Sequence, residues 1–235
     1  MAKKQFFLII DTETTQADHV ADFGAVVCDK QGNIYEHCAV LVNDFKNEDL
    51  FHDKNLVDNS LWARNNLQSR KLKYSDMLEN GSRTLASVNA INKFLERVIA
   101  KYPEITLTAY NLPFDISKSA NSGINLDMFA NRVCLWKLFC GHFADTKAYK
   151  KFVLENHYFG KRTVKTASLT YLTNAECASH FLTGVDAIEP HTAFEDIVRH
   201  EIYILKAIVN KKNWREKEIG YNYNNYQLKN NFLAK

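Results

Sequence analysis

Two acidic residues near the start of the chain are placed where their carboxylates could hold a metal ion. Asp11 and Glu13 follow the apolar run FFLII. Because alternate residues of a strand point to the same side, the two carboxylates share one face. Two like charges at the end of a buried strand are unfavourable unless a cation neutralises them, and hard oxygen ligands suit Mg²⁺ or Mn²⁺. Taken alone, however, most such pairs are ordinary surface residues.

A third acid, Asp115, lies in the segment AYNLPFD, which follows a short predicted strand at residues 105–109. In open α/β sheets functional groups collect at the ends of strands. The simpler interpretation is an acidic residue in the first turn of a helix, where the helix dipole favours it. For Asp115 alone the simpler interpretation is the better one. Asp115 becomes a candidate metal ligand only in combination with the other acidic residues.

A histidine and a fourth acid are placed at the start of the last long helix. Thr192 and Glu195 form a T-x-x-E capping box, which makes His191 the N′ residue and Asp196 the N4 residue. These two positions meet at a helix start, so we expect the imidazole and the carboxylate to lie together. The alternative is a His–Asp pair that only orients the helix end.

Together, the four acids and the histidine are the components of a two-metal phosphodiesterase site. In such a site two ions about 4 Å apart bind the scissile phosphate, and one activates water while the other stabilises the leaving 3′ oxygen. The imidazole of His191 can accept the proton of that water as a general base near neutral pH.

The elements that must position these residues are strands first and then alternating helices and strands. Strands are predicted at 6–10, 23–28 and 34–42, as antiparallel neighbours, and further strands at 105–109 and 133–136. This pattern predicts an α/β fold with a mixed five-stranded sheet and helices on both of its faces.

The remaining segments set the expected domain organisation. Thr84 is the predicted N-cap of a helix with one apolar face. The polar stretch 44–83 is expected to form an insertion of short helices and loops, which is a candidate lid over the site. After Lys211 the composition shifts to Asn and Tyr. We therefore expect a core domain at 1–211 and a tail at 212–235 that packs on the core or is disordered.

Three segments, IIDTETT, AYNLPFD and HTAFED, resemble in this order the exonuclease motifs of the DEDDh branch of the ribonuclease H-like exonucleases. That family includes proofreading subunits of polymerases and RNA-trimming enzymes. The likeness covers about residues 5–210. The tyrosine branch has Tyr four residues before the last Asp, and Thr192 stands there, which favours the histidine branch. The resemblance implies a ribonuclease H-like sheet and a metal-dependent 3′→5′ exonuclease.

The resemblance also implies roles for the five residues. Asp11 would bridge two divalent cations, Mg²⁺ or Mn²⁺. Glu13 and Asp196 would complete the first cation site, and Asp115 would hold the second cation directly or through water. His191 would be the general base.

Four further residues would bind the 3′-terminal nucleotide if the resemblance holds: Thr12, Thr14, Asn111 and Phe114. Phe114 would pack against a base or the strand wall, and the alternative for it is simple core packing.

Two positions depart from the family pattern. Tyr110 stands where histidine is common, and Gln16 stands where glycine is frequent. Either change could alter how the 3′ end is held, and neither removes a metal ligand.

The expected substrate is a free 3′ end, single-stranded or terminal, of DNA, with release of nucleoside monophosphates. RNA is the alternative substrate, because discrimination at the 2′-hydroxyl depends on pocket detail that a sequence does not show. A polymerase or another replication or repair protein is a candidate partner. The alternative of another class is a non-catalytic nucleic-acid-binding module of the same fold, although all five catalytic positions are filled.

Composition and charge limit the remaining classes. The chain has 46% hydrophobic and 24% charged residues and a net charge of +3, which is a globular composition and does not demand nucleic acid. Its apolar runs are far shorter than the roughly 20 residues of a membrane span, and we expect no signal peptide, no membrane partner and a cytoplasmic location. Basic residues at 147–165 are the first candidates for phosphate contacts.

Two other groups of residues offer competing sites. Cys134, Cys140 and His142 form a loose cluster without a CxxC pair, so a zinc site there is a minor alternative, and five cysteines without repeated spacing argue against disulfides. His180 and Asp186 are a rival His–Asp pair that lacks the capping logic of the last helix.

Overall fold

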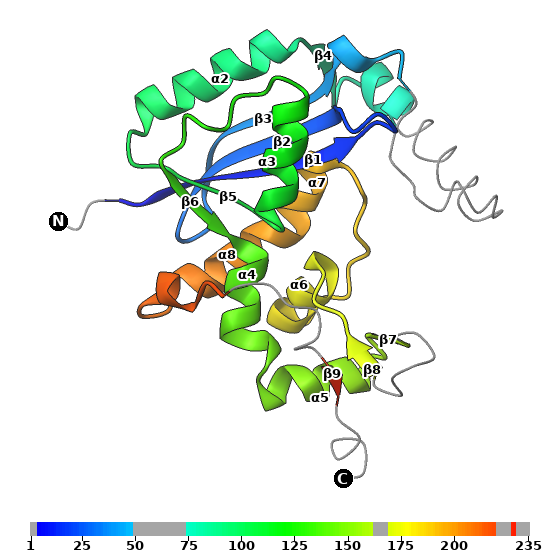
Figure 1. Ribbon diagram of the computed structural model, residues 1–235, viewed down its shortest axis with the longest axis vertical. Coiled ribbons are helices and arrows are strands. Elements are labelled where there is room, and N and C mark those ends of the chain that lie inside the picture. The colour runs from blue at the N-terminus through cyan, green and yellow to red at the C-terminus, as the bar shows by residue number, and fades with distance from the viewer. Residues whose placement is uncertain (1–3, 49–73, 162–168, 220–226, 229–235) are drawn as a thin grey trace.

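The structure, a computed structural model, describes residues 4–48, 74–161, 169–219 and 227–228 (Figure 1). Within these ranges, no helix combines the length and the apolar character needed to span a membrane.

A mixed sheet of six strands forms the centre of the molecule, with the order β4-β3-β2-β1-β5-β6. Its first three strands are antiparallel neighbours, and β4, β5 and β6 each run parallel to their neighbour. The strands are β1 (Phe6–Thr14), β2 (Val20–Asp29), β3 (Ile34–Val42), β4 (Thr84–Ala86), β5 (Thr106–Ala109) and β6 (Asn131–Cys134). This confirms the α/β fold with a mixed sheet, and it is consistent with a ribonuclease H-like arrangement.

The predicted number of five strands was wrong, because β4 adds a sixth strand at the edge. Thr84 was predicted to cap a helix, but residues 84–86 pair with the end of β3. The helix α2 (Val88–Lys101) begins later, and its cap is Ser87, whose hydroxyl accepts a hydrogen bond from the Ala90 N–H at 3.2 Å. Leu85 is 49% exposed, so its apolar character reflects a strand edge and not a buried helix face.

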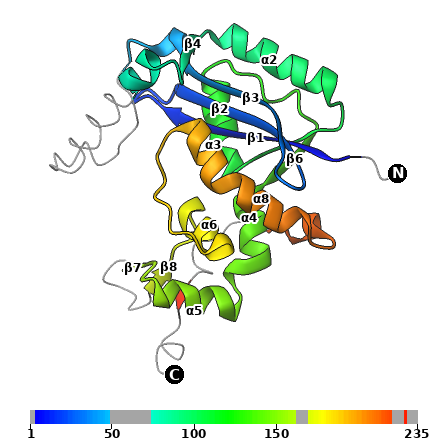
Figure 2. The same cartoon turned by 180° about the vertical axis from the view of Figure 1, so that it is seen from behind.

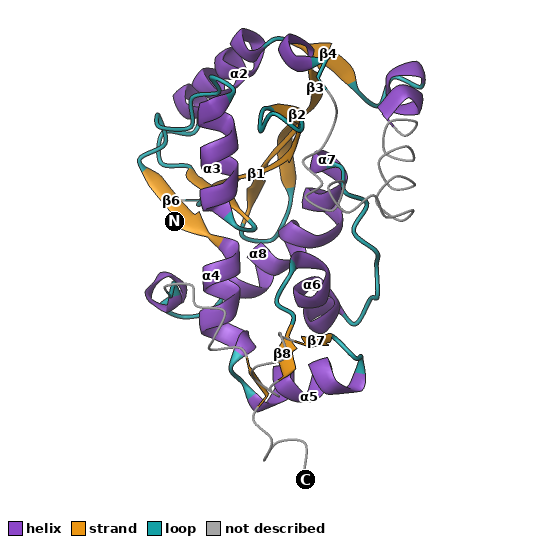
Figure 3. Cartoon of the chain, turned by 45° about the vertical axis from the view of Figure 1, so that its right-hand side comes forward, coloured by secondary structure: helices purple, strands orange, loops and turns teal. Residues whose placement is uncertain are grey.

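Helices cover both faces of the sheet. Residues of β1 alternate between the faces: Phe7 and Ile9 lie in one core cluster, and Leu8 and Ile10 lie in the other. The second cluster includes α2 and α3 (Leu112–Asn121), and the first includes α4 (Leu135–Phe139), α6 (Ala175–Thr183) and α8 (Ile202–Val209). Figures 1 and 2 show the two faces from opposite sides, with α3 in front in the first and α8 in front in the second, and Figure 3 shows α3 and α7 (Ala193–Asp196) on either side of β1 and β2.

The remaining elements extend the molecule away from the sheet. A π-helical turn, η3 (Cys140–Ala144), leads into α5 (Lys147–Glu155). A small antiparallel sheet lies beyond it, with the strands β7 (Phe159–Lys161), β8 (Leu169–Tyr171) and β9 (Gln227–Leu228). Short 3₁₀ turns form η1 (Asn43–Phe45) and η5 (Trp214–Lys217), and residues 74–79 are helical.

The last long helix is continuous but not regular. It consists of α7 (Ala193–Asp196), the π-helical turn η4 (Ile197–Glu201) and α8. A π turn holds one more residue per turn than an α-helix and is frequent at functional sites. The turn lies directly after Asp196, so it changes the direction in which the following side chains point.

Candidate active site

A glycine on the neighbouring strand lets the last helix approach Asp11. Asp11 pairs with Gly24 of β2, and a Cβ on Gly24 would lie 2.6 Å from the backbone of Ala193 and of Phe194. Real Cβ atoms do not come so close to a backbone, so only glycine allows this contact. The start of α7 therefore lies directly against the end of β1, although the two segments are far apart in the sequence.

This contact brings together the residues predicted from the first and third segments. Glu13, His191 and Asp196 each offer a ligand atom, and these atoms all lie within 4.8 Å of one another. Asp196 is buried, and its Oδ2 accepts a hydrogen bond from the Thr192 N–H at 2.9 Å. The two carboxylates form a donor set that fits a divalent cation such as Mn²⁺ or Mg²⁺, and the imidazole lies beside them.

Asp115 lies beneath the end of β1 and is fully buried. Its Oδ1 accepts a hydrogen bond from the Thr12 hydroxyl at 2.8 Å, which fixes the carboxyl group. Burial raises the pKa of Asp115 to about 7, and the Thr12 hydrogen bond opposes this rise. Thr14 is buried as well, so both threonines lie under the site and Thr12 orients Asp115.

Asp11 lies between the two groups of acids. Desolvation raises the pKa of Asp11 well above its usual value, and the nearby carboxylates of Glu201, Asp115, Glu13 and Asp196 raise it further. A carboxylate surrounded by other carboxylates is stabilised when a divalent cation binds among them, because the cation offsets both desolvation and repulsion. The donor set and its charge therefore both fit cations.

The other predicted substrate residues lie at the start of α3. Asn111 has a left-handed backbone conformation, with φ of 74°, and lines a cavity beside Asp11. Phe114 is 41% exposed, with the Lys118 Nζ 5.2 Å from its ring centroid. Phe114 is therefore not a core residue, and its ring is accessible to a ligand.

The departures from the family pattern occupy different environments. The Tyr110 hydroxyl donates a hydrogen bond to the Thr173 carbonyl, and burial raises the pKa of this phenol well above its usual value. Tyr110 thus ties the end of β5 to the segment after β8. Gln16 is exposed beyond the end of β1.

The capping box predicted for Thr192 and Glu195 is wrong. Thr192 is the N-cap residue, but its hydroxyl makes no capping hydrogen bond, and its N–H is bound by Asp196. The N–H of Ala193 instead donates to Asp22 Oδ2 at 3.0 Å, so a carboxylate from β2 caps the helix. The prediction failed because a distant residue takes the role that the local motif offers.

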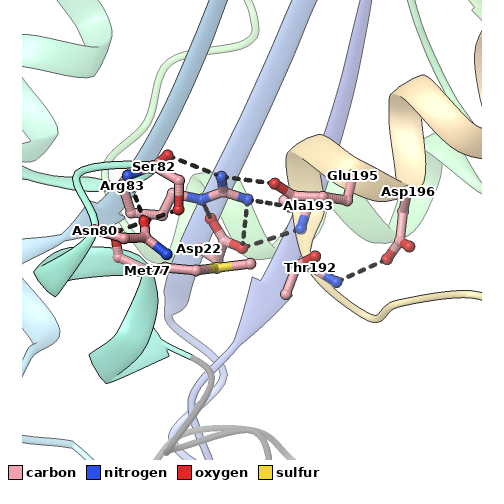
Figure 4. Close-up of polar contacts among 9 residues, drawn as sticks. All are labelled: Asp22, Met77, Asn80, Ser82, Arg83, Thr192, Ala193, Glu195 and Asp196. Atoms are coloured by element: carbon pink, nitrogen blue, oxygen red, sulfur yellow. Dashed lines mark hydrogen bonds and ion pairs between the residues drawn. The ribbon is translucent and has the colours of Figure 1, made fainter.

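Glu195 is engaged in a buried ion cluster with Arg83 and Asp22 (Figure 4). Arg83 Nε lies 3.1 Å from Asp22 Oδ1, and Arg83 Nη1 lies 3.1 Å from Glu195 Oε1. Arg83 and Asp22 are both fully buried. Because removing one partner of a buried ion pair costs about 3–5 kcal/mol, this cluster fixes the start of α7 firmly against β2. The sequence did not predict this ion cluster, and Arg83 was given no role beyond being the last residue of the predicted insertion.

A fifth carboxylate, Glu201, was also missed. It is 3% exposed, and its Oε1 accepts a hydrogen bond from the Tyr110 N–H at 3.1 Å. In a regular α-helix five residues turn by about 500°, so Glu201 would point about 140° away from Asp196. The π turn η4 removes most of this difference, and Asp115 and Asp196 are both electrostatic neighbours of Glu201.

A cavity of about 420 Å³ opens beside the acids, between the sheet and the segment that precedes α6. Asp11, Asn111 and Glu201 line it. Tyr110 and Trp136 line it as well, and their ring centroids are 6.5 Å apart. A pocket with aromatic walls next to a carboxylate cluster offers space for a ligand at the metal-binding groups.

The competing sites are not assembled in the same way. Among the described residues, the compact group of potential metal ligands consists of Glu13, His191 and Asp196. The candidate zinc ligands Cys134, Cys140 and His142 do not form such a group within the described part of the chain. All five cysteines are free.

The rival pair also has another explanation. His180 Nδ1 and Asp186 Oδ1 are 3.7 Å apart, and both contact the Tyr158 hydroxyl. This arrangement ties α6 to the segment before β7.

The predicted phosphate contacts are described in part. Lys150 forms an ion pair with Asp145, and Lys151 pairs with Glu155 on the exposed face of α5. Arg162 and Lys165 fall outside the described residues, as does most of the predicted insertion at 44–83.

Comparisons with known proteins add no family to this description: no family model matches the chain, and no curated protein is significantly similar to it. The likeness to the DEDDh exonucleases therefore stays a prediction from the three motifs.

Proposed function

We propose that the protein is a metal-dependent 3′→5′ exonuclease that hydrolyses phosphodiester bonds at the 3′ end of nucleic acid. One observation carries the proposal: Glu13 of β1 and the pair His191 and Asp196, which lie far from it in the sequence, offer ligand atoms within 4.8 Å of one another. Carboxylates and a histidine converging at the end of a buried strand suit phosphoryl chemistry with divalent cations.

The chain's own residues would divide the work as follows. Asp11, Glu13 and Asp196 would hold one cation, and Asp11 and Asp115 the other. When bound, the cations neutralise the phosphate charge and lower the pKa of a water molecule. His191 is exposed at the edge of the group, so its imidazole is accessible to accept the proton of the attacking water.

DNA is the substrate that we propose, and RNA is the alternative. A terminal nucleotide would enter the cavity beside Asp11, where the rings of Tyr110 and Trp136 are available for contact with a base. The Phe114 ring, which is exposed at the start of α3 but does not line this cavity, would contact the neighbouring part of the strand. Contact with a 2′-hydroxyl would separate the two substrates. Matched DNA and RNA oligonucleotides, compared by their turnover, give the answer directly.

The test is a digestion that resolves polarity. The full chain would be incubated with 5′-labelled single-stranded and duplex oligonucleotides in Mn²⁺, in Mg²⁺ and in chelator. We expect a ladder that shortens from the 3′ end and nucleoside monophosphates as products, both abolished by chelator and by Asp11→Asn. Equal inertness of the wild type and the variant with every metal and substrate would instead favour a non-catalytic binding module.

A further inference from the structure

Glu201 has one carboxylate oxygen without a partner inside the fold. Its Oε1 is bound by the Tyr110 N–H, but its Oε2 is buried and has no hydrogen bond. Leaving a buried polar atom unpaired is costly, so such an atom calls for a partner that the chain itself does not supply. Glu201 is also one of the residues that line the cavity beside Asp11, so this cavity is the side from which a partner would approach it.

The charges around Glu201 indicate what kind of partner this is. Among the carboxylates around Asp11, Glu201 acts most strongly on it, and Asp115 is the strongest charged neighbour of Glu201. These three acids therefore form a second group of neighbouring carboxyl groups next to Glu13, His191 and Asp196. Carboxyl groups packed together bind a cation, which lets them ionise, and they disfavour an anion such as a bare phosphate.

The geometry also limits how a cation would reach Glu201. The second group is not among those whose ligand atoms lie within 4.8 Å of one another, so it is less compact than the first. Small divalent cations keep several of their own water molecules when only one or two carboxylates bind them. A water molecule on such an ion can bridge the remaining distance by donating a hydrogen bond.

We propose that Glu201 is part of the second cation site, where its Oε2 accepts a hydrogen bond from a water molecule on the ion that Asp11 and Asp115 hold. The inference rests on the proposed function, because it assumes a second cation. It adds a positioning residue from the π turn η4 to the residues that the three motifs contain. Tyr110 orients Glu201 through its backbone N–H, so the end of β5 is linked to the same ion.

The experiment measures Mn²⁺ binding to the full chain by the loss of the free-ion electron paramagnetic resonance signal. The variants are Glu201→Gln, which keeps the size of the side chain, and Glu155→Gln as the control on the exposed face of α5. We expect two ions per wild-type chain. Glu201→Gln should keep the affinity of the first ion and lose about tenfold or more in affinity for the second, as outer-sphere partners of metal ligands typically do.

Thermal melting of the same proteins provides the second readout. Without metal, Glu201→Gln should melt as a folded protein, and the rise in Tm on adding saturating Mn²⁺ should be smaller than for the wild type and the control.

If Glu201→Gln binds both ions as tightly as the wild type, the inference is overturned while the exonuclease proposal stands. A raised KM with unchanged Mn²⁺ affinities would also overturn it, since Glu201 would then contact substrate. If the wild type binds no Mn²⁺ and degrades no 3′ end, the proposed exonuclease function itself is contradicted, and the inference about Glu201 falls with it.

Discussion

His191 stands in a backbone conformation that residues other than glycine rarely adopt. Its φ is 53°, in the left-handed region. Such strain persists only where the surrounding structure enforces it, and it is common at functional sites. Here the residue after it, Thr192, begins a helix that Asp22 and Arg83 hold in place. The strained turn directs the imidazole toward Glu13 and Asp196.

Replacing His191 tests its proposed role as general base. We expect His191→Ala to lower kcat on a 3′-labelled oligonucleotide by about 10²–10⁴-fold, which is the usual contribution of a positioned base. His180→Ala is the matched control, because His180 contacts Tyr158 and Asp186 away from the acids. A loss of the same size in both variants would contradict the assignment, since it would reflect general damage to the fold.

The raised pKa of Asp115 predicts a pH dependence of stability without metal. The pKa is about 7 in the folded chain and near 4 in the unfolded chain, so the folded state binds the proton more tightly. Stability in chelator should therefore fall as pH rises from about 4 to about 7. Asp115→Asn should flatten this part of the profile, and saturating Mn²⁺ should do the same for the wild type. Thermal melts across this range measure it, and an unchanged slope in Asp115→Asn would contradict the shift.

Sequence reasoning predicted the residues whose positions follow from local geometry. His191 and Asp196 lie close together because both occupy fixed positions around the start of one helix. Asp11 and Glu13 share one face of a strand because they are two residues apart. Glu201 was not predicted, because a 3.6-residue period places it away from Asp196 and nothing in the local pattern signals a π turn.

At the level of elements, the approach of α7 to the sheet depends on Gly24. Gly24→Ala would place a methyl group into the backbone of Ala193 and Phe194, so the helix start must move away from β1. We expect a clear loss of stability and a loss of Mn²⁺ affinity in the protein that remains folded.

Gly141→Ala is the control for this change. A Cβ on Gly141 would lie even closer to the backbone carbonyl of Lys217, but at a site remote from the acids. It should lower the Tm and leave Mn²⁺ affinity unchanged, as judged by a metal titration of each folded variant. Equal Mn²⁺ affinities in the Gly24 variant and the wild type would show that α7 need not lie so close.

The elements were predicted best where their pattern is long. β1, β2, β3 and α2 have strong apolar patterns, and each was found, although β1 continues past the predicted end at Ile10 to Thr14 and α2 begins later than predicted. The three-residue strand β4 was missed because its pairing with the end of β3 is a distant contact that local propensity does not contain. The Arg83 cluster was missed for the same reason, since its partners are 61 and 112 residues away.

At the scale of the whole molecule, the described residues directly after 211 pack against the core. Trp214 is 8% exposed, and its ring centroid lies 5.9 Å from that of Phe7 on β1. The carbonyl of Trp214 contacts His142, and Glu218 accepts a hydrogen bond from the Cys134 N–H at 2.9 Å. The change of composition at this point therefore does not coincide with the end of the packed structure among the described residues.

Trp214 should consequently contribute strongly to stability. We expect Trp214→Ala to lower the free energy of unfolding by about 3–5 kcal/mol, as for other large aromatic residues removed from a core. Trp214→Phe, which keeps an aromatic ring against Phe7, should cost much less. Urea unfolding of both variants measures the difference, and a near-zero effect of Trp214→Ala would mean that the contact with Phe7 adds little.

The joining of the first strand to the last long helix has a consequence for synthesis on the ribosome. Asp11 is translated well before His191 and Asp196, with most of the sheet between them. No growing chain that stops short of Asp196 contains the full set of these residues, so a nascent or prematurely terminated polypeptide carries no complete proposed centre. A destructive activity of the proposed kind would thus be withheld until Asp196 has been translated.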